Sequence, residues 1–261
     1  MSMSEIEFEI RDHVARITIN RPDSMNAMTT GMWPAMADML REVEPNPQVR
    51  CILIAGAGAN FCAGGDVKEF STTVDMKPAE RAVYWNRVAD RVNGLFHLIE
   101  RVPQTVVVSA RGMAAGGGLS LLAAADLAIV SENCRCVAAQ IRLGAIPDSA
   151  LGYNLVRSVG LKRAKQYCLL GETFDARTAL EMGLVNWVVP DPELESRTEA
   201  LVAKAARIPA VAMARTKAEL NFAHTRTLAD HLAQESQDVA ACVVEDSYVD
   251  NVRAFMDTRR P

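Results

Sequence analysis

Three short apolar segments, separated by stretches with helical periodicity, constrain the fold of this chain more than any other feature. They occupy residues 51–55, 105–110 and 127–130. Largely apolar runs of this length are typical of strands that helices cover on both faces. Residues 83–99, between the first two runs, carry apolar side chains at helical spacing. The sequence therefore predicts an α/β fold.

The N-terminal part predicts a more exposed strand followed by a helix. Apolar and polar residues alternate over 15–20, which predicts a half-buried strand that the Arg21-Pro22 pair ends. The next segment has Trp33 on an apolar helical face, and Thr29 or Thr30 precedes it as a candidate cap. We therefore expect a capped helix directly after this strand.

The last part of the chain shows only helical patterns. They begin at residue 193, and this part is rich in alanine. We therefore divide the chain into a core of residues 1–192 and a helical region of residues 193–261. Helices this apolar gain their stability by lying against something large, so we expect contact with the core or with a neighbouring subunit.

Composition and charge exclude several classes of function. A net charge of −4 provides no basic face, so we expect no nucleic-acid partner. The sequence has neither a signal region nor an apolar run of membrane-spanning length, which predicts a cytoplasmic protein without a membrane partner. Most of the six scattered cysteines lie in apolar surroundings, so we expect reduced, buried thiols. Because Cys134-x-Cys136 has no third ligand nearby, we expect no metal site.

Two glycine-rich turns are the candidates for chemistry. Gly116, Gly117 and Gly118 stand where a short apolar helix begins, so their amide N–H groups lack intrahelical partners. Such a turn holds either a phosphate or a developing oxyanion, although glycines also serve in plain tight turns. A second bare turn, Gly64-Gly65, follows the strand predicted at residues 51–55. Together the turns predict a pair of N–H donors for one carbonyl oxygen.

Here the sequence resembles the crotonase superfamily, which comprises enoyl-CoA hydratases and isomerases. The resemblance covers nearly the whole chain, and the shared order and spacing of its motifs make it specific. The motifs are Asn20-Arg21-Pro22 with Asn26-Ala27, Phe61-Cys62-Ala63-Gly64-Gly65-Asp66, Gly112-x3-Gly116-Gly117-Gly118, Gly144-Ala145-Ile146-Pro147-Asp148, the pattern from Ala176 to Pro190, and the closing Ala254-Phe255-x3-Arg259-Arg260-Pro261.

The resemblance implies a site and an assembly. The amides of Gly65 and Gly117 would grip the thioester carbonyl of an acyl-CoA, while other residues would bind the CoA portion, namely Ala27, Ala63, Asp66 and Val67. Coenzyme A would enter as part of the substrate, and no separate cofactor is expected. The implied fold is a spiral of strand–strand–helix turns with C-terminal helices that build homotrimers, which often pair into hexamers.

Two departures from the family argue against hydration of a double bond. Hydratases of this family use two glutamates, and the corresponding positions here hold Ser120 and Gln140. A hydroxyl and an amide lack the pKa of a general base, so we expect a poor hydratase. The resemblance leaves Ser120 and Gln140 as candidates for the substrate pocket.

Asp148 is the remaining candidate for acid–base chemistry. Its position resembles that of the acting aspartate in some isomerases of the superfamily and in 4-chlorobenzoyl-CoA dehalogenases. As a base it would move a proton between the α and γ carbons of an enoyl thioester through an enolate. The alternative is an N-cap for a helix that starts at Ser149 or Ala150.

Two other functions stay open. Dehalogenation or thioester hydrolysis would use Asp148 as a nucleophile, and the dehalogenase pattern places Asn93 where that family has a histidine, with His97 one turn later. Asn93 is accordingly a candidate for the substrate pocket. Because both hydratase glutamates are missing, the chain is also a candidate for a protein that binds acyl-CoA without turnover.

Overall fold

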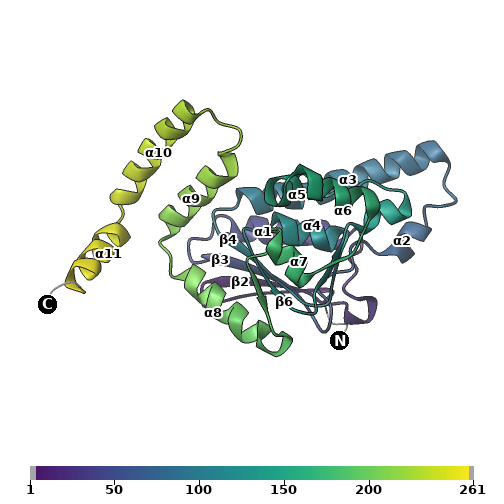
Figure 1. Cartoon of the computed structure of the whole chain (residues 1–261), viewed down its shortest axis with the longest axis horizontal. Coiled ribbons are helices and arrows are strands. Elements are labelled where there is room, and N and C mark those ends of the chain that lie inside the picture. The colour runs from purple at the N-terminus through teal and green to yellow at the C-terminus, as the bar shows by residue number, and fades with distance from the viewer. Residues whose placement is uncertain (1–3, 259–261) are drawn as a thin grey trace.

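The computed structural model describes residues 4–258, so Arg259, Arg260 and Pro261 of the closing motif lie outside the described residues. Figure 1 shows the arrangement of its helices and strands. The strands are β1 (Ile6–Arg11), β2 (Val14–Ile19), β3 (Cys51–Gly56), β4 (Thr105–Ala110), β5 (Met113–Ala115), β6 (Leu127–Ser131), β7 (Arg135–Val137), β8 (Phe174–Asp175) and β9 (Trp187–Val189). The α-helices are α1 (Met32–Val43), α2 (Val67–Ser71), α3 (Pro78–Arg101), α4 (Gly117–Ala124), α5 (Leu151–Val159), α6 (Leu161–Leu170), α7 (Ala176–Glu181), α8 (Leu194–Ala206), α9 (Ala210–Phe222), α10 (Leu228–Val243) and α11 (Asp246–Asp257). Short 3-10 turns are η1 (Pro22–Ser24), η2 (Ala139–Leu143) and η3 (Asp191–Glu193).

A six-stranded sheet forms the centre of the molecule, with the strand order β1-β2-β3-β4-β6-β9. The β1–β2 pair is antiparallel, whereas the other neighbours run parallel. A second, three-stranded sheet has the order β5-β7-β8. The three apolar runs in the sequence are β3, β4 and β6, which lie side by side in the larger sheet, so the α/β prediction is confirmed.

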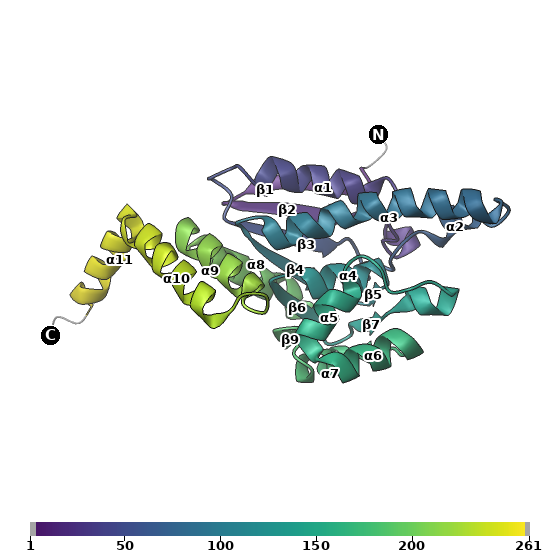
Figure 2. The ribbon, with the colours of Figure 1, turned by 90° about the horizontal axis from the view of Figure 1, so that it is seen from above.

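Helices cover both faces of the larger sheet, which explains why its central strands are apolar at every position. Successive side chains of a strand point to opposite faces. In β3, Ile52 and Ile54 belong to the main core with residues of α1, α3 and α4, whereas Cys51 and Leu53 pack with Val202 of α8 on the other face. Figure 2 shows α1 and α3 lying along the sheet.

The start of α1 differs from the sequence prediction. The helix begins at Met32, its N-cap residue is Gly31, and no side chain caps it. The expectation that Thr29 or Thr30 caps this helix is therefore wrong. The Thr30 amide donates to Glu69 Oε2 at 2.7 Å instead, because the loop before α1 lies against α2. A tertiary contact has displaced the local cap.

The last three helices, α9 to α11, lead away from the sheet (Figures 1 and 2). This confirms the helical C-terminal region, although its first helix, α8, packs on the sheet. The boundary at residue 193 stays a prediction. Large apolar side chains on α10 and α11 are exposed in the single chain, among them Val239, Tyr248 and Val252. Among residues 4–258, no helix is both long enough and apolar enough to cross a bilayer.

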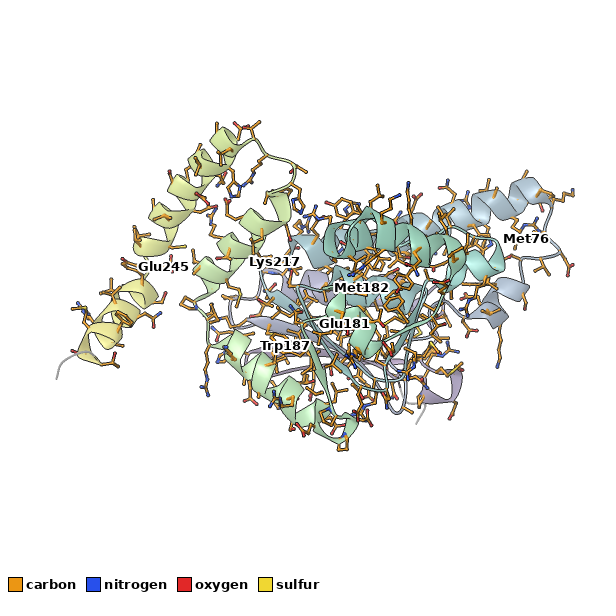
Figure 3. All side chains as sticks on the ribbon, in the orientation of Figure 1. Met76, Glu181, Met182, Trp187, Lys217 and Glu245 are labelled. Carbon is orange, nitrogen blue, oxygen red and sulfur yellow. The ribbon has the colours of Figure 1, made fainter. Side chains whose placement is uncertain are left out.

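Lys217 fastens α9 to the core. Figure 3 shows it on the side of α9 that faces the sheet. Its ammonium group donates to the carbonyl oxygens of Ile99 at 2.9 Å and Gln104 at 3.1 Å. It also lies 2.7 Å from Asp126 Oδ2, and the same oxygen accepts the amide of Val106. Only 8% of the Lys217 side chain is exposed, so all three of its donors are used in the interior.

The cysteines match the expectation of free thiols. All six are unpaired by disulfides, and Cys51, Cys62, Cys134 and Cys136 are buried. Burial raises the pKa of the Cys51 and Cys62 thiols to about 12, so these thiols stay protonated near neutral pH.

Candidate active site

The two glycine-rich turns lie side by side. The segment after β3 passes next to β5, where Cys62 and Ala114 form a parallel bridge. The Cys62 amide donates to Met113 O at 2.9 Å, and the Ala115 amide donates to Cys62 O at 2.9 Å. This pairing brings two turns that are about fifty residues apart in the sequence to the same place.

The backbones of the turns approach so closely that only glycine fits. Gly64 and Gly116 have φ angles of +94° and +52°, a region that favours glycine. A Cβ on Gly64 would lie 2.9 Å from Ala115 O and 3.3 Å from the amide nitrogen of Gly117. Within residues 4–258, neither the Gly65 amide nor the Gly117 amide donates a hydrogen bond to the protein. Both are therefore available to an acceptor on a ligand.

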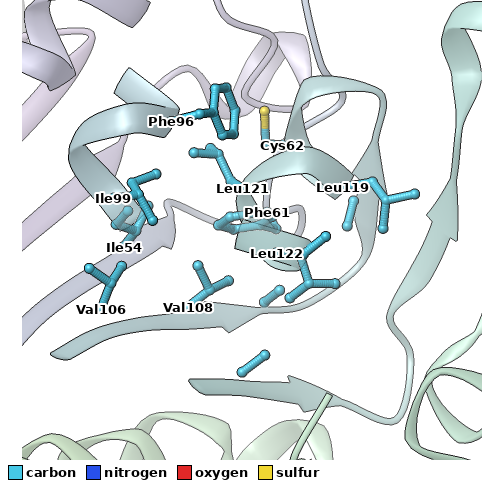
Figure 4. Packing of buried hydrophobic residues seen from close by; sticks show 14 of the residues in the cluster. Ile54, Phe61, Cys62, Phe96, Ile99, Val106, Val108, Leu119, Leu121 and Leu122 are labelled. Carbon is cyan, nitrogen blue, oxygen red and sulfur yellow. The ribbon is translucent and has the colours of Figure 1, made fainter. Parts of the chain in front are cut away.

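The residues that flank the two glycine-rich turns are packed in the apolar core. Figure 4 shows Phe61, which precedes the first turn, next to Leu121 and Leu122 of α4. Phe61 and Cys62 are fully buried, as are Leu119 and Leu121 just after the second turn. Because both turns rest on the same packed cluster, their relative position is fixed by the core and not by the turns alone.

The predicted CoA-binding residues come together beside the first turn. Gly65 forms a bridge with Met28, and the Ala63 amide donates to Met25 O at 3.0 Å. The segments that carry Ala27 and Ala63 are thereby neighbours, and Asp66 and Val67 follow directly at the start of α2. Val67 is exposed, as a surface contact for a ligand requires. Ligand contacts of these four residues stay a prediction.

Asn26 holds this arrangement together, a role the sequence analysis did not assign. Its side chain is fully buried. It accepts the Arg21 amide at 2.8 Å and donates to Ala57 O at 2.8 Å and Asn60 O at 2.6 Å. The available signal was an asparagine shortly after the Arg21-Pro22 pair, since this residue type tolerates the left-handed region and bonds nearby backbone; in the structure its φ is +57°.

Asp66 is held as a carboxylate by its neighbours. It caps α2 by accepting the Lys68 amide at 3.0 Å, and Arg21 Nη1 lies 2.9 Å from its Oδ2. Burial acts to raise its pKa, but the Arg21 hydrogen bond, the Lys68 amide and both positive charges outweigh this, so the pKa is lowered. Asp66 is therefore anionic at neutral pH, and its charge holds the start of α2 against the Arg21 loop.

Asp148 stands in a constrained loop between η2 and α5. Its Oδ1 accepts Gln140 Nε2 at 3.1 Å and Ser149 Oγ at 3.2 Å. Among the described residues, Oδ2 makes no hydrogen bond, and the side chain is exposed. Ser149 and Ala150, the next two residues, both have a φ of +57°. Such backbone is costly for residues other than glycine and is typical of functional sites.

The N-cap interpretation of Asp148 is wrong. Helix α5 begins at Leu151, its N-cap residue is Ala150, and no side chain caps it. The left-handed backbone at Ser149 and Ala150 separates the Asp148 carboxylate from the helix start. Its carboxylate is therefore free for another purpose.

Ser120 and Gln140 link Asp148 to the second donor turn. The buried Ser120 hydroxyl lies 3.2 Å from Gly116 O and 3.4 Å from Asp148 O. The Gln140 amide group holds Asp148 through Nε2, while its buried Oε1 has no donor within residues 4–258. Both residues border the candidate site, and their contact with a substrate stays a prediction.

Asn93 lies on the wall of a cavity of about 900 Å³ at the C-terminal end of α4. Phe96, His97 and Ala150 line the same cavity. No hydrogen bond in the described part of the chain joins Asn93 or His97 to Asp148 or to either donor turn. The structure thus places Asn93 beside a cavity that Ala150 also lines, and its contact with a substrate stays a prediction.

Comparisons with known proteins identify the family of this chain. Residues 9–261 match the family model described as enoyl-CoA hydratase/isomerase. The chain belongs to this family. Its crotonase-type fold is thereby confirmed, and so is an acyl-CoA enzyme of the hydratase/isomerase class at the level of the family.

Individual members of the enoyl-CoA hydratase/isomerase family carry different names. The chain is 31% identical to 1,2-epoxyphenylacetyl-CoA isomerase of Escherichia coli K12, over 99% of this chain and 98% of that protein. It is 28% identical to short-chain-enoyl-CoA hydratase of Clostridium acetobutylicum, over 100% and 97% of the two chains. A crystal structure from Thermobifida fusca YX in complex with CoA matches with a TM-score of 0.83 and 30% identity, covering 92% and 93% of the two chains.

Substitution of Gly117 tests the donor turn. A Cβ on Gly117 would lie 2.6 Å from Cη2 of the buried Trp33, so the backbone must shift in Gly117→Ala. We expect the displaced amide to cost roughly 3–4 kcal/mol of barrier, as loss of one oxyanion donor does. The measurement is kcat with an acyl-CoA substrate. In the control Gly152→Ala, the added methyl meets no atom within 4 Å, so activity should not change.

Proposed function

We propose that this protein isomerises the double bond of an enoyl-CoA, with Asp148 as the acid and base. The Asp148 carboxylate removes a proton from the α carbon of a 3-enoyl thioester, and the electron pair moves into the thioester carbonyl. The resulting dienolate is held by the Gly65 and Gly117 amides. The Asp148 carboxylic acid then returns the proton to the γ carbon, which yields the 2-enoyl thioester. No water, oxidant or further cofactor enters the reaction.

The observation that carries this proposal is a single carboxylate, that of Asp148, beside two backbone amides without a hydrogen-bond acceptor. The hydratases of the family have two glutamates at their site. Asp148 Oδ1 is anchored by Gln140 and Ser149, which leaves Oδ2 free to exchange a proton. Ser120 connects the Asp148 backbone to the turn that carries Gly117. A single carboxylate is sufficient to move one proton between two carbons, whereas addition of water by the family's route needs two glutamates.

A direct assay tests the proposal. The purified protein is incubated with 3-hexenoyl-CoA, and the products are separated and weighed by mass spectrometry. We expect 2-hexenoyl-CoA, which has the same mass as the substrate and gains the absorbance of a conjugated thioester. A 3-hydroxyacyl-CoA as the main product, heavier by one water, would contradict the proposal and establish a hydratase. Tight acyl-CoA binding in calorimetry without any product would support the non-catalytic alternative.

Dehalogenation remains the alternative within the enzyme class. The unbonded Asp148 Oδ2 also suits a nucleophile, which would form an aryl ester with 4-chlorobenzoyl-CoA and release chloride. Intact-protein mass spectrometry after mixing detects this ester as an added mass. Hydrolysis of a saturated acyl-CoA to free CoA would instead indicate a thioesterase.

We also propose that the protein works as a homotrimer, or a hexamer of two trimers, in the cytoplasm. The exposed apolar residues of α10 and α11 support an assembly, because a free chain would leave this surface in water. The free thiols of the six cysteines are compatible with a reducing compartment. We expect sedimentation of the native protein to give a multiple of the mass of three chains.

Placing a charge on that surface tests the assembly. Val252 on α11 is exposed, and we expect Val252→Glu to shift sedimentation toward the monomer. Val74, which follows α2, is also exposed, and Val74→Glu is the matched control that should leave the mass unchanged. A native protein that sediments as a monomer at all concentrations would refute the proposed assembly.

A further inference from the structure

An aromatic ring lies against each of the two donor glycines. A Cβ on Gly65 would collide with the Phe70 ring, and a Cβ on Gly117 would lie 2.6 Å and 2.8 Å from two carbons of the Trp33 ring. The rings come from different elements, since Phe70 belongs to α2 and Trp33 to α1. Both glycines therefore have a flat, rigid surface where other residues have a side chain.

The Phe70 ring is itself fixed in place. It meets the Trp85 ring edge to face, with the ring centroids 4.8 Å apart and the planes at 86°. Trp85 Nε1 donates to Thr73 Oγ1 at 3.2 Å, and the hydroxyl of the buried Thr73 donates to Phe70 O at 2.9 Å. These contacts connect Phe70, Trp85 and Thr73 to one another, so the Phe70 ring has a fixed position against Gly65.

The Trp33 ring is fixed by burial. Only 5% of Trp33 is exposed, and its ring lies 6.3 Å from that of Phe96 between α1 and α3. It belongs to the main core cluster, which also holds Phe61 below the first turn. The ring that supports Gly117 is thus connected to the same packed body as the turn before Gly65.

The two ring contacts restrict the backbone motion of the donor glycines. Glycine has the widest range of backbone conformations, so a bare turn tends to move. A catalytic donor, however, must stay within about 0.5 Å of its productive position. We propose that Phe70 and Trp33 are positioning residues that hold Gly65 and Gly117, respectively, and thereby set the separation of the two amides. This inference rests on the proposed oxyanion hole.

The test measures hydrogen bonding to the thioester carbonyl directly. Hexanoyl-CoA labelled with ¹³C at the carbonyl is saturated and therefore has no double bond to isomerise. The C=O stretch of this bound probe is read by isotope-edited infrared difference spectroscopy. Two N–H donors lower this frequency on binding. We expect Phe70→Leu and Trp33→Phe to lose part of the downward shift, and kcat/KM to fall by roughly 10- to 100-fold, because misplacement by about 1 Å has this effect. Affinity for CoA alone should stay unchanged.

A matched control separates positioning from general loss of packing. Phe174 is as buried as Trp33, packs on Tyr167 and has no glycine of the donor turns against it. Phe174→Leu should keep the full frequency shift despite a similar loss of stability. If Trp33→Phe does not fold, Phe70→Leu decides, because Phe70 is only partly buried.

Each outcome has one meaning. A wild-type protein that binds the probe without any frequency shift refutes the oxyanion hole and, with it, this inference. A normal wild-type shift that both variants retain refutes the inference alone. An equal loss of the shift in Phe174→Leu also refutes it, because the effect would then follow packing in general.

Discussion

Asp148→Asn should reduce the rate of isomerisation by about 10²- to 10⁴-fold, which is the usual contribution of a positioned acid–base group. Asparagine has nearly the same shape and still accepts from Gln140 and Ser149 through Oδ1. It cannot take up a proton, however, so the step at the α carbon is lost while the binding of acyl-CoA is kept. The measurement is kcat with 3-hexenoyl-CoA, together with calorimetric titration of hexanoyl-CoA.

The control for this substitution is Glu172→Gln. Glu172 is also an exposed carboxylate held by a glutamine, since Gln166 Nε2 donates to it at 2.9 Å. It lies in a loop after α6, and its neutralisation should leave kcat as it is. Isomerisation at the wild-type rate by Asp148→Asn would eliminate Asp148 as the base, and with it the proposed mechanism.

The second large effect concerns stability. Lys217→Met should lower the free energy of unfolding by about 3–5 kcal/mol, because it leaves the Asp126 carboxylate, which is only 21% exposed at the wall of the cavity, without its cation. The carbonyls of Ile99 and Gln104 lose their donor as well. Urea unfolding measures the change. Lys204→Met, which replaces an exposed lysine on α8, should change the value by less than about 0.5 kcal/mol.

The pH dependence of this effect has a definite sign. Burial raises the pKa of Asp126, although the charge and hydrogen bond of Lys217 and the Val106 amide act to lower it. For a carboxyl group with a raised pKa in the folded state, the folded form gains stability as pH falls through that pKa toward the lower pKa of the unfolded chain, because protonation removes the buried charge. Without Lys217 this pKa rises further. The difference in the free energy of unfolding between Lys217→Met and the wild type should therefore become smaller on acidification.

A double substitution distinguishes the ion pair from lost packing. Asp126→Asn keeps an acceptor for the Val106 amide but removes the charge. Combined with Lys217→Met, it should recover part of the lost stability, since no unpaired charge then remains in the interior. No recovery in the double variant would show that the cost comes from the orphaned carbonyls of Ile99 and Gln104.

The sequence was sufficient where a local pattern carries the physics. The strands β3, β4 and β6 were predicted because residues buried on both faces of a sheet must all be apolar. Gly64 and Gly116 were recognised as parts of bare turns, and the structure gives both a positive φ, with a close backbone approach at Gly64 as well. Free, buried cysteines and a helical C-terminal region likewise followed from composition and periodicity.

The sequence was insufficient where a contact joins distant segments. Thr30 was expected to cap α1, but it bonds Glu69, which is thirty-nine residues away. A cap for α5 was the alternative role considered for Asp148, but two left-handed residues separate it from the helix. In both cases tertiary contacts or backbone geometry overrode a correct local preference, which no pattern of neighbouring residues reveals.

By itself, the sequence determined the α/β class and the family, and it predicted Gly65 and Gly117 as amide donors and Asp148 as the acid–base residue. Only the tertiary structure decided that Phe70 and Trp33 lie against Gly65 and Gly117. It also decided that Lys217 of α9 forms an ion pair with Asp126 of the core. The physical reason is the range of the interactions. Burial and backbone conformation restrict the residue type at each position, so they produce patterns that can be read along the sequence. Ring contacts and ion pairs instead depend on where the packed helices place the two partners.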